Sequence, residues 1–429
     1  MENLSPDMRR FERKPYERQI LFSLNHESTK YRKDLYAKII DISDGGMGIE
    51  TDYPLAPGHT LWLNDGRVKT GKVRWIARLN NRYRAGIELS RGYDKEDLII
   101  SEKTERYRTL LDDATDKFLN RLKLLEARCT SSKDEKILED LKNIMDDMMS
   151  FCEEFEKNAG YSKEELKKII RRFHRDTDPV LSKSYCIKRV RIWPQGYQGD
   201  YKTLETIYRN TPCSEGLGYY LDLWALDTPL GHAVRNRIKM LENILRKEIT
   251  MRYGPKILNI ACGSCRELVG ITNEIDEHDA RIICIDNDPD ALIFAGIRLS
   301  SLGLDDRIEF RKYNAIRMFD DETNIVEFGK QDIIYSVGLF DYLPDEFLIK
   351  LLSALYNLLD TGGTLIAAFK DANLYRPQEY HWIFDWDGFL QRGERDFRNI
   401  LSIAGIPDEA IREEREESGL IIFYTISKR

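Results

Sequence analysis

Lys256-Ile-Leu-Asn-Ile-Ala-Cys-Gly-Ser-Cys265 is the stretch of this 429-residue sequence that decides the fold of its C-terminal half. Its Ile- and Leu-rich first half predicts a buried strand, and the small residues that follow predict a tight turn into a helix. The next apolar run ends at Asp286, about 20 residues after the turn. This arrangement is typical of a nucleotide-binding strand–helix–strand unit.

Predicted strands and helices alternate downstream, with strands at 308–310, 332–335 and 364–369 and helices at 290–302 and 345–359. Such alternation indicates a doubly wound parallel sheet with helices on both faces. We therefore expect an α/β Rossmann-type core over residues 255–429.

The glycine turn favours a ligand without phosphates. A dinucleotide site needs Gly-x-Gly-x-x-Gly, but only Gly263 stands between Ala261 and Cys265. A nucleoside-type cofactor demands less of the loop, and the carboxylate of Asp286 could accept hydrogen bonds from both ribose hydroxyls.

In these residues the sequence resembles class I S-adenosylmethionine-dependent methyltransferases. The matching segments are 259–265, Asp286, Tyr313-Asn314-Ala315, 332–342 and 359–365. The first motif departs from the family, because Asn259, Ala261 and Cys265 replace an acid and two glycines. The resemblance implies S-adenosylmethionine as cofactor, with the binding residues Asn259, Ala261, Cys262, Gly263, Asp286, Asn287, Asn314, Ala315, Ser336 and Gly338.

A narrower resemblance lies upstream, in Trp193-Pro-Gln-Gly-Tyr-Gln-Gly-Asp200 and Pro229-Leu-Gly-His-Ala-Val-Arg-Asn-Arg237. These segments are similar to bacterial methyltransferases described as making 3-hydroxypalmitic acid methyl ester, which implies a small acyl or carboxylate acceptor. A carboxylate is already nucleophilic, so transfer needs alignment and a dry pocket rather than a general base. The candidate catalytic residues are Tyr342, Tyr197 and Asp200, with Arg235 as a further candidate for orienting an acid. Each could equally be a packed aromatic or a surface pair.

Residues 15–90 predict a small β-barrel, because short alternating runs are separated by turn clusters without intervening helices. Two polar motifs accompany it, Arg9-Arg-Phe-Glu-Arg13 and Asp41-Ile-Ser-Asp-Gly-Gly46. Guanidinium groups bind phosphate and the acceptor edge of guanine in pairs.

Arg-x-x-x-Arg followed by Asp-x-Ser-x-x-Gly resembles the PilZ domain, a bacterial receptor for cyclic di-GMP, over about residues 8–92. The resemblance implies that Arg9, Arg10 and Arg13 wrap a guanine–phosphate corner of the dinucleotide. It also implies that Asp41, Ser43 and Gly46 hold the other guanine from the barrel surface.

The residues between these two parts, from about 95 to 175, have a helical period with one apolar face. Capping boxes at Ser132/Glu135 and Ser162/Glu165 mark helix starts. Such a segment can space its neighbours or form a homodimer. We expect a PilZ-like barrel at 1–92, a helical connector at 93–184 and a methyltransferase domain at 185–429.

The composition excludes several classes of protein. A net charge of −7 argues against a nucleic-acid partner, and no apolar run has the roughly 18 residues of a membrane helix. The first residues do not form a secretory signal, and an odd number of scattered cysteines favours reduced thiols in the cytoplasm. Cys262 and Cys265 lack a second pair or a His cluster, so we expect neither a metal site nor redox chemistry.

The sequence therefore predicts a cyclic di-GMP-responsive S-adenosylmethionine-dependent methyltransferase for a small acyl or carboxylate acceptor. In this hypothesis, ligand capture orders the Arg9–Arg13 segment and changes access to the methyl-donor pocket. The altered first motif leaves an alternative open: a cyclic di-GMP-binding signalling adaptor whose methyltransferase-like domain is an interaction or cofactor-sensing module. Methylation of protein or RNA is a third possibility.

Overall fold

The computed structural model describes residues 14–24, 35–43, 46–64, 68–79, 82–89, 102–129 and 134–429. These described residues fall into two compact units, those within 1–116 together with 153–176, and those within 117–152 together with 177–429. This division passes through helices α1 (Glu102–Glu126), α2 (Glu135–Ala159) and α3 (Lys163–Leu181). It does not follow the expected boundary at 184, and the boundary at 92 lies outside the described residues, so the three-domain division stays a prediction.

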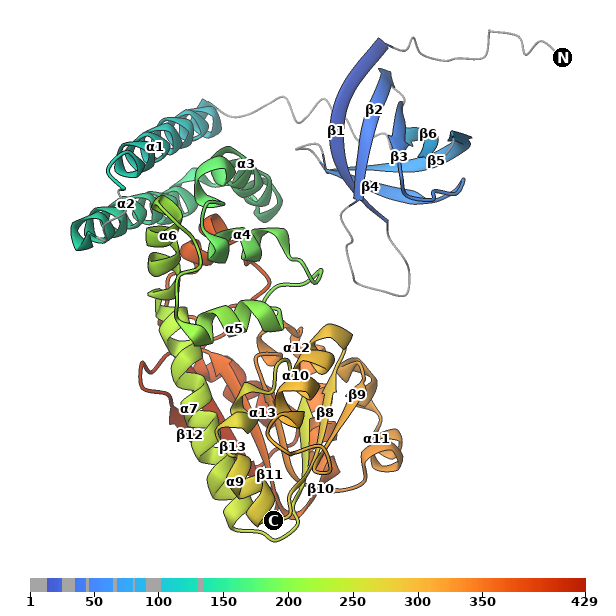
Figure 1. Ribbon diagram of the computed structural model, residues 1–429, viewed down its shortest axis with the longest axis vertical. Coiled ribbons are helices and arrows are strands. Elements are labelled where there is room, and N and C mark those ends of the chain that lie inside the picture. Colours follow the sequence, from blue (N-terminus) through green and yellow to red (C-terminus); the bar gives the residue numbers. More distant parts are fainter. Residues whose placement is uncertain are drawn as a thin grey trace, which may run out of the picture. The chain divides into compact units, whose positions relative to one another are not determined.

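The described strands of the first unit close into a barrel in the order β1-β2-β3-β6-β5-β4 (Figure 1). They are β1 (Lys14–Leu24), β2 (Leu35–Ser43), β3 (Gly46–Thr51), β4 (Thr60–Asn64), β5 (Val68–Leu79) and β6 (Arg82–Leu89). Neighbours pair antiparallel, and the pairing of β1 with β4 closes the sheet. Apolar side chains such as Phe22, Ile39 and Ile49 fill the interior. The predicted barrel is confirmed.

Parts of α1 and α2 belong to the second unit. The backbone N–H of Asp134 donates to Tyr220 Oη at 2.8 Å, and Lys142 Nζ pairs with Asp227 at 2.5 Å.

The predicted capping box at Ser162 and Glu165 is confirmed by their reciprocal hydrogen bonds, whereas Ser132 lies outside the described residues. Dimer formation through this segment stays a prediction.

Four helices precede the sheet: α4 (Tyr185–Ile192), α5 (Tyr201–Arg209), α6 (Leu217–Leu226) and α7 (Pro229–Thr250). Asp200 caps α5 through the backbone N–H groups of Lys202 and Thr203, and Thr228 caps α7 through that of Gly231. Each cap satisfies backbone donors that the helix itself leaves unpaired.

The second unit contains a seven-stranded sheet in the order β12-β13-β11-β10-β7-β8-β9, within residues that are described throughout. Its strands are β7 (Lys256–Ile260), β8 (Arg281–Asp286), β9 (Ile308–Lys312), β10 (Gln331–Val337), β11 (Leu359–Lys370), β12 (Ile411–Arg415) and β13 (Ile421–Ser427). Five neighbouring strands, β11, β10, β7, β8 and β9, are parallel to one another, as predicted. The antiparallel pair β12–β13 was not predicted. Strand order reverses between β7 and β10, which is the topological switch point where open sheets bind ligands.

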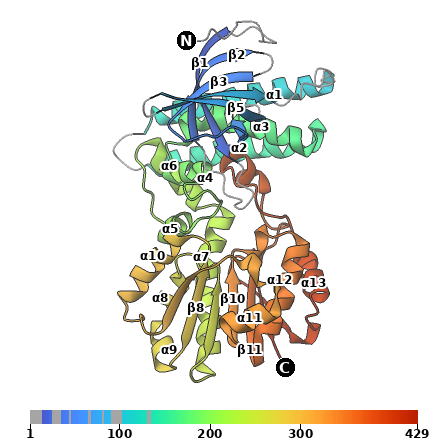
Figure 2. The same ribbon diagram turned by 90° about the vertical axis from the view of Figure 1, so that its right-hand side faces the viewer.

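Helices cover the sheet on both faces (Figure 2). They are α8 (Arg266–Val269), α9 (Thr272–Glu277), α10 (Pro289–Ser300), α11 (Asp321–Phe328), α12 (Asp345–Leu358) and α13 (Glu394–Ile403), with short turns η2 (Ala315–Phe319), η3 (Phe340–Tyr342), η4 (Glu379–Ile383) and η5 (Asp408–Ala410). One face packs Leu258, Ile334 and Leu365 against α12 and α13. Among the described residues, no helix is long and apolar enough to cross a membrane.

Candidate functional site

The carboxyl ends of β7, β8, β9 and β10 meet at one edge of the parallel sheet and carry the residues predicted to bind the cofactor. Ser336 Oγ donates to the carbonyl of Ile260 at 2.9 Å, which ties the end of β10 to the end of β7. The N–H of Tyr313 donates to the carbonyl of Asp286 at 2.9 Å, which ties the segment after β9 to the end of β8. The structure thus brings the predicted residues to one edge, and their binding role stays a prediction.

The turn after β7 is held against Asp286. The N–H of Gly263 donates to Asp286 Oδ2 at 2.8 Å, and the N–H of Asp288 donates to Oδ1 at 2.9 Å. Ala261 and Gly263 both have positive φ, and a Cβ on Gly263 would meet nothing within 4 Å. Burial raises the pKa of Asp286, although the hydrogen bonds from these backbone N–H groups act in the opposite direction. The turn therefore leaves open space above a fixed carboxylate.

The remaining predicted cofactor residues lie around this turn. Asn314 is exposed and caps η2, where its Oδ1 accepts from the N–H of Ile316 at 3.1 Å. Asn287 and Ala315 are half-buried. Asn259, by contrast, is buried on the β7 strand and donates to Glu267 Oε1 at 2.9 Å, beneath the turn rather than on its open side.

Beside this edge lies a cavity of about 90 Å³. Its walls are mostly apolar and include Val190, Leu204, Ile207, Leu226, Leu230, Val234, Phe384, Trp386 and Phe389. Gly338, a predicted cofactor residue, and Tyr342, a predicted catalytic residue, also line it. The cofactor edge and the cavity therefore share the loop after β10.

Two buried cations line the cavity. Arg237 is 8% exposed and donates to Tyr208 Oη at 3.1 Å, but within the described part of the chain its Nε has no hydrogen-bond partner. Lys370 Nζ lies 2.5 Å from Asp341 Oδ2 and 3.6 Å from the centroid of the Phe389 ring. Burial lowers the pKa of Lys370 to about 8, although Asp341 acts in the opposite direction.

The candidate catalytic residues occupy different environments. Tyr342 Oη accepts from Trp386 Nε1 at 2.8 Å, whereas Tyr197 Oη donates to Asp288 Oδ2 at 2.8 Å and lies outside the cavity lining. Burial raises the pKa of both tyrosines, and Asp288 adds to the effect at Tyr197. Both therefore remain protonated at neutral pH.

Asp200 also lies outside the cavity lining, and both of its carboxylate oxygens are engaged. Oδ1 accepts from Arg189 Nη2 at 2.5 Å and Oδ2 accepts from Thr203 Oγ1 at 3.0 Å, in addition to the helix cap. These contacts give Asp200 a clear structural role. Its catalytic role stays a prediction.

Sequence reasoning overlooked three residues that the structure places at the site. Arg235 was the candidate on α7, but it donates to the carbonyl of Leu226, whereas Arg237 lines the cavity. Residues two apart on a helix point in nearly opposite directions, so only one could face the cavity. Arg237 follows Leu230 and Val234 at helical spacing, and this cation on an apolar face was the available signal. Lys370, at the end of β11, had no such signal.

Glu205 is the third overlooked residue. It is 4% exposed, accepts from Ser264 Oγ at 2.7 Å and from Arg298 Nη2 at 2.6 Å, and so connects α5, the turn after β7 and α10. Burial alone would raise the pKa of Glu205, but the hydrogen bond from Arg298 lowers it. The carboxylate is therefore a charged anchor for the cofactor turn.

The second set of predicted residues lies on the β2–β3 hairpin. Ser43 pairs with Gly46 and Asp41 with Gly48, and a register shift between Ile39 and Asp41 marks a β-bulge, a feature that re-aims side chains. A Cβ on Gly48 would stand 2.9 Å from the Asp41 carboxylate, so a larger residue there would require that carboxylate to move. Arg9, Arg10 and Arg13 lie outside the described residues.

Comparison with known protein families gives two matches. The family model described as "PilZ domain" matches residues 7–106, and the model described as "Putative methyltransferase" matches residues 159–378. No curated protein matches the chain.

Among solved structures, a possible exported protein from Bordetella parapertussis is 17% identical, with a TM-score of 0.47 over 77% of this chain and 99% of that one. An O-methyltransferase family protein from Burkholderia thailandensis is 13% identical, with a TM-score of 0.35 over 47% of this chain and 59% of that one. Magnesium protoporphyrin IX methyltransferase from Synechocystis PCC 6803, with bound SAM, is 14% identical, with a TM-score of 0.34 over 47% and 84% of the two chains.

Proposed function

Because the chain belongs to the family described as "Putative methyltransferase" and carries a PilZ domain at its N-terminus, we propose that it is a class I S-adenosylmethionine-dependent methyltransferase controlled by cyclic di-GMP. One observation carries the enzymatic part. Gly338 belongs both to the sheet edge with the predicted cofactor residues and to the lining of the apolar cavity. A donor seated on that edge would direct its methyl group into the cavity.

The cavity indicates an acceptor with an apolar body and an anionic head. Its walls are mostly apolar, and the unpartnered Nε–H of Arg237 would donate a hydrogen bond to a carboxylate. A buried donor without a partner costs about 1–3 kcal/mol, so pairing it favours binding of an acid. The carboxyl end of a fatty acid or hydroxylated fatty acid has both features, which agrees with the narrower sequence resemblance, although a cavity of about 90 Å³ has room for that end and not for the whole chain.

The chemistry of such an acceptor requires no general base. S-adenosylmethionine, when bound, supplies a methyl group on a positively charged sulfur. Transfer of that group to a carboxylate would cancel opposite charges and move no proton, so the residues of this chain would need only to hold the acid and keep the cavity dry. Protonated Tyr342 would then orient the reactants rather than remove a proton, and Arg237 would hold the acid.

The regulatory part rests on the PilZ match, which spans both ligand motifs. We assign cyclic di-GMP binding to Arg9, Arg10, Arg13, Asp41, Ser43 and Gly46. Asp41 and Ser43 stand two residues apart after the bulge, beside Gly46 and Gly48 on the adjacent strand. A polar patch with small residues opposite it allows a flat base to approach the backbone.

Calorimetric titration with S-adenosylmethionine tests the enzymatic assignment. We expect binding by the wild type, a loss of about 10- to 100-fold in Asp286→Asn, and no change in cyclic di-GMP affinity. Asp290→Asn is the matched control, because Asp290 is exposed and near the same loop. Absence of binding by folded wild-type protein would leave the signalling adaptor as the function.

A further inference from the structure

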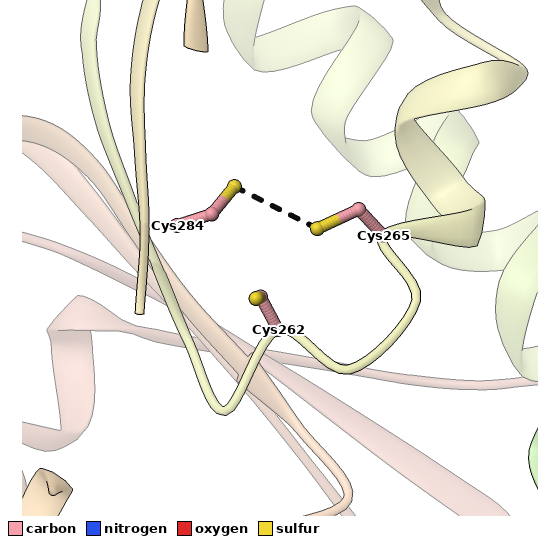
Figure 3. A group of neighbouring side chains, drawn as sticks. All are labelled: Cys262, Cys265 and Cys284. Carbon is pink, nitrogen blue, oxygen red and sulfur yellow. Dashed lines mark hydrogen bonds between the residues drawn. The ribbon is translucent and has the colours of Figure 1, made fainter. Parts of the chain in front are cut away.

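Cys262, Cys265 and Cys284 form a compact buried cluster beneath the turn after β7. Their Sγ atoms all lie within 4.8 Å of one another, and Sγ of Cys265 is 3.7 Å from Sγ of Cys284. Figure 3 shows the side chains pointing toward one another, two from the turn and one from the neighbouring strand. Cys265 and Cys284 are 0% exposed, and Cys262 is 8% exposed.

Strand register explains how Cys284 reaches the other two. Asn259 pairs with Cys284 on β8 and with Tyr335 on β10, so these three side chains form a row across one face of the sheet. The turn after β7 bends over the same face, since Cys265 has a left-handed φ of 48°. In the sequence, Cys284 stands far from the Cys-x-x-Cys pair, and only the parallel pairing of β7 with β8 brings it near.

The neighbours of the cluster are polar. Asn259 Nδ2 lies 3.9 Å from Sγ of Cys265 and 4.0 Å from Sγ of Cys284, and it also donates to Glu267 Oε1. Tyr335 Oη donates to the same oxygen at 2.8 Å. The Asn259 amide thus has a carboxylate as its hydrogen-bond partner on one side and faces two sulfurs, which are weak acceptors, on the other.

The 3.7 Å separation of the Cys265 and Cys284 sulfurs is compatible with a zinc site. Sulfurs bound to Zn²⁺ at about 2.3 Å in a tetrahedron lie about 3.8 Å apart. We propose that Cys262, Cys265 and Cys284 bind one Zn²⁺ ion, which fixes the turn after β7 to β8. A disulfide between Cys265 and Cys284 would instead need access for an oxidant, whereas an ion can be captured as the chain folds.

Charge and ligand number are consistent with this assignment. Three thiols release three protons to solvent when Zn²⁺ binds, which leaves a complex with net charge −1 beside the Asn259 amide. The fourth position would be left to water, because among the described residues the cluster includes no fourth cysteine, histidine or carboxylate. The expectation of no metal site rested on the absence of a second cysteine pair or a His cluster beside Cys262 and Cys265, whereas strand pairing brings a single further cysteine, Cys284, to them.

Metal analysis of the full chain, purified without chelator, tests the proposal. We expect about one zinc per chain in the wild type and in the control Cys186→Ser, which removes a buried cysteine elsewhere in the same unit. Cys284→Ser and Cys265→Ser are each expected to lose at least nine-tenths of that zinc. Circular dichroism of each variant establishes whether the fold is retained.

X-ray absorption at the zinc edge identifies the zinc ligands in the wild-type protein, so this test does not depend on whether a variant folds. Three sulfurs at about 2.3 Å are expected. Metal-free protein, zinc held only by nitrogen and oxygen, or an intact mass lowered by the two hydrogens of a Cys265–Cys284 disulfide would each overturn the proposal. None of these measurements depends on cofactor binding or methyl transfer.

Discussion

The guanidinium of Arg237 lies directly against Gly338, the glycine that follows β10. A Cβ built on Gly338 would stand 3.3 Å from Arg237 Nη1, and its φ of +106° is one that other residues rarely adopt. Gly338 thus has two reasons to be glycine, its backbone conformation and its contact. Through this contact Arg237, which we propose holds the acceptor, touches the edge of the sheet that we propose binds the cofactor.

Substitution of Arg237 and, separately, of Arg235 distinguishes the roles of these two arginines of α7. In Arg237→Met we expect the KM for a fatty acid such as palmitate to rise about 10-fold or more, because a charge-assisted hydrogen bond in a buried site is lost. Arg235→Met removes the same charge two residues earlier and is expected to change KM less than about 2-fold, since Arg235 does not line the cavity and its guanidinium is engaged by the backbone carbonyl of Leu226. Steady-state kinetics checks both. Equal effects of the two substitutions would contradict the assignment.

Lys370 gives the site a pH dependence. Its pKa is lowered to about 8, so above that pH the ammonium loses its proton and Asp341 remains as an unpaired negative charge in the cavity. We therefore expect acceptor affinity to fall as pH rises through about 8 and to level off below it. A profile of kcat/KM between pH 6.5 and 9.5, with S-adenosylmethionine saturating, measures this.

Lys370→Arg is the control for that profile. A guanidinium stays charged throughout the range, so the decline near pH 8 is expected to disappear, even if the absolute rate is lower. A decline that persists in Lys370→Arg would assign the titration to another group.

Glu205 is expected to stabilise the fold as well as the cofactor turn. Glu205→Gln leaves Arg298 without its charge partner in a buried position, which costs about 3 kcal/mol. The lowered pKa of Glu205 means that this stabilisation is present above about pH 4.3 and is lost as the pH falls through the folded-state pKa. Urea unfolding at pH 7 and pH 4 measures it. Exposed Glu215→Gln is the control, and equal midpoints would contradict the prediction.

Local patterns were enough to predict the parallel sheet and the barrel. Alternation of strand and helix signals located β7 to β11, and turn residues between short apolar runs located β2 to β6, whereas β1 was not located. They also placed Gly263, Asp286 and Gly338 at strand ends, where parallel pairing brings them to one edge.

What local patterns could not provide is the identity of neighbours from distant segments. Cys284 meets Cys265 only through strand register, and Lys370 lines the same cavity as Gly338 because β10 and β11 are adjacent. The antiparallel β12–β13 pair was missed because Ile411-Arg-Glu-Glu-Arg415 is mostly charged, and its strand conformation comes from pairing with β13.

The coupling between the two proposed sites is the most demanding prediction. If cyclic di-GMP controls the enzyme, saturating dinucleotide should change S-adenosylmethionine affinity or kcat/KM by about 5-fold or more. Asp41→Ala should abolish both the binding and the change, because it removes the carboxylate that faces Gly48 on the barrel. Asp52→Ala is the matched control, since Asp52 is exposed on the same barrel and forms a surface ion pair with Arg82 at 3.2 Å.

Thermodynamic linkage provides an internal check. If the dinucleotide changes the affinity for the donor by some factor, the donor must change the affinity for the dinucleotide by the same factor. Calorimetric titrations in both orders measure the two factors. Tight dinucleotide binding with unchanged donor affinity and unchanged kcat/KM would show two independent sites and would rule out control by cyclic di-GMP.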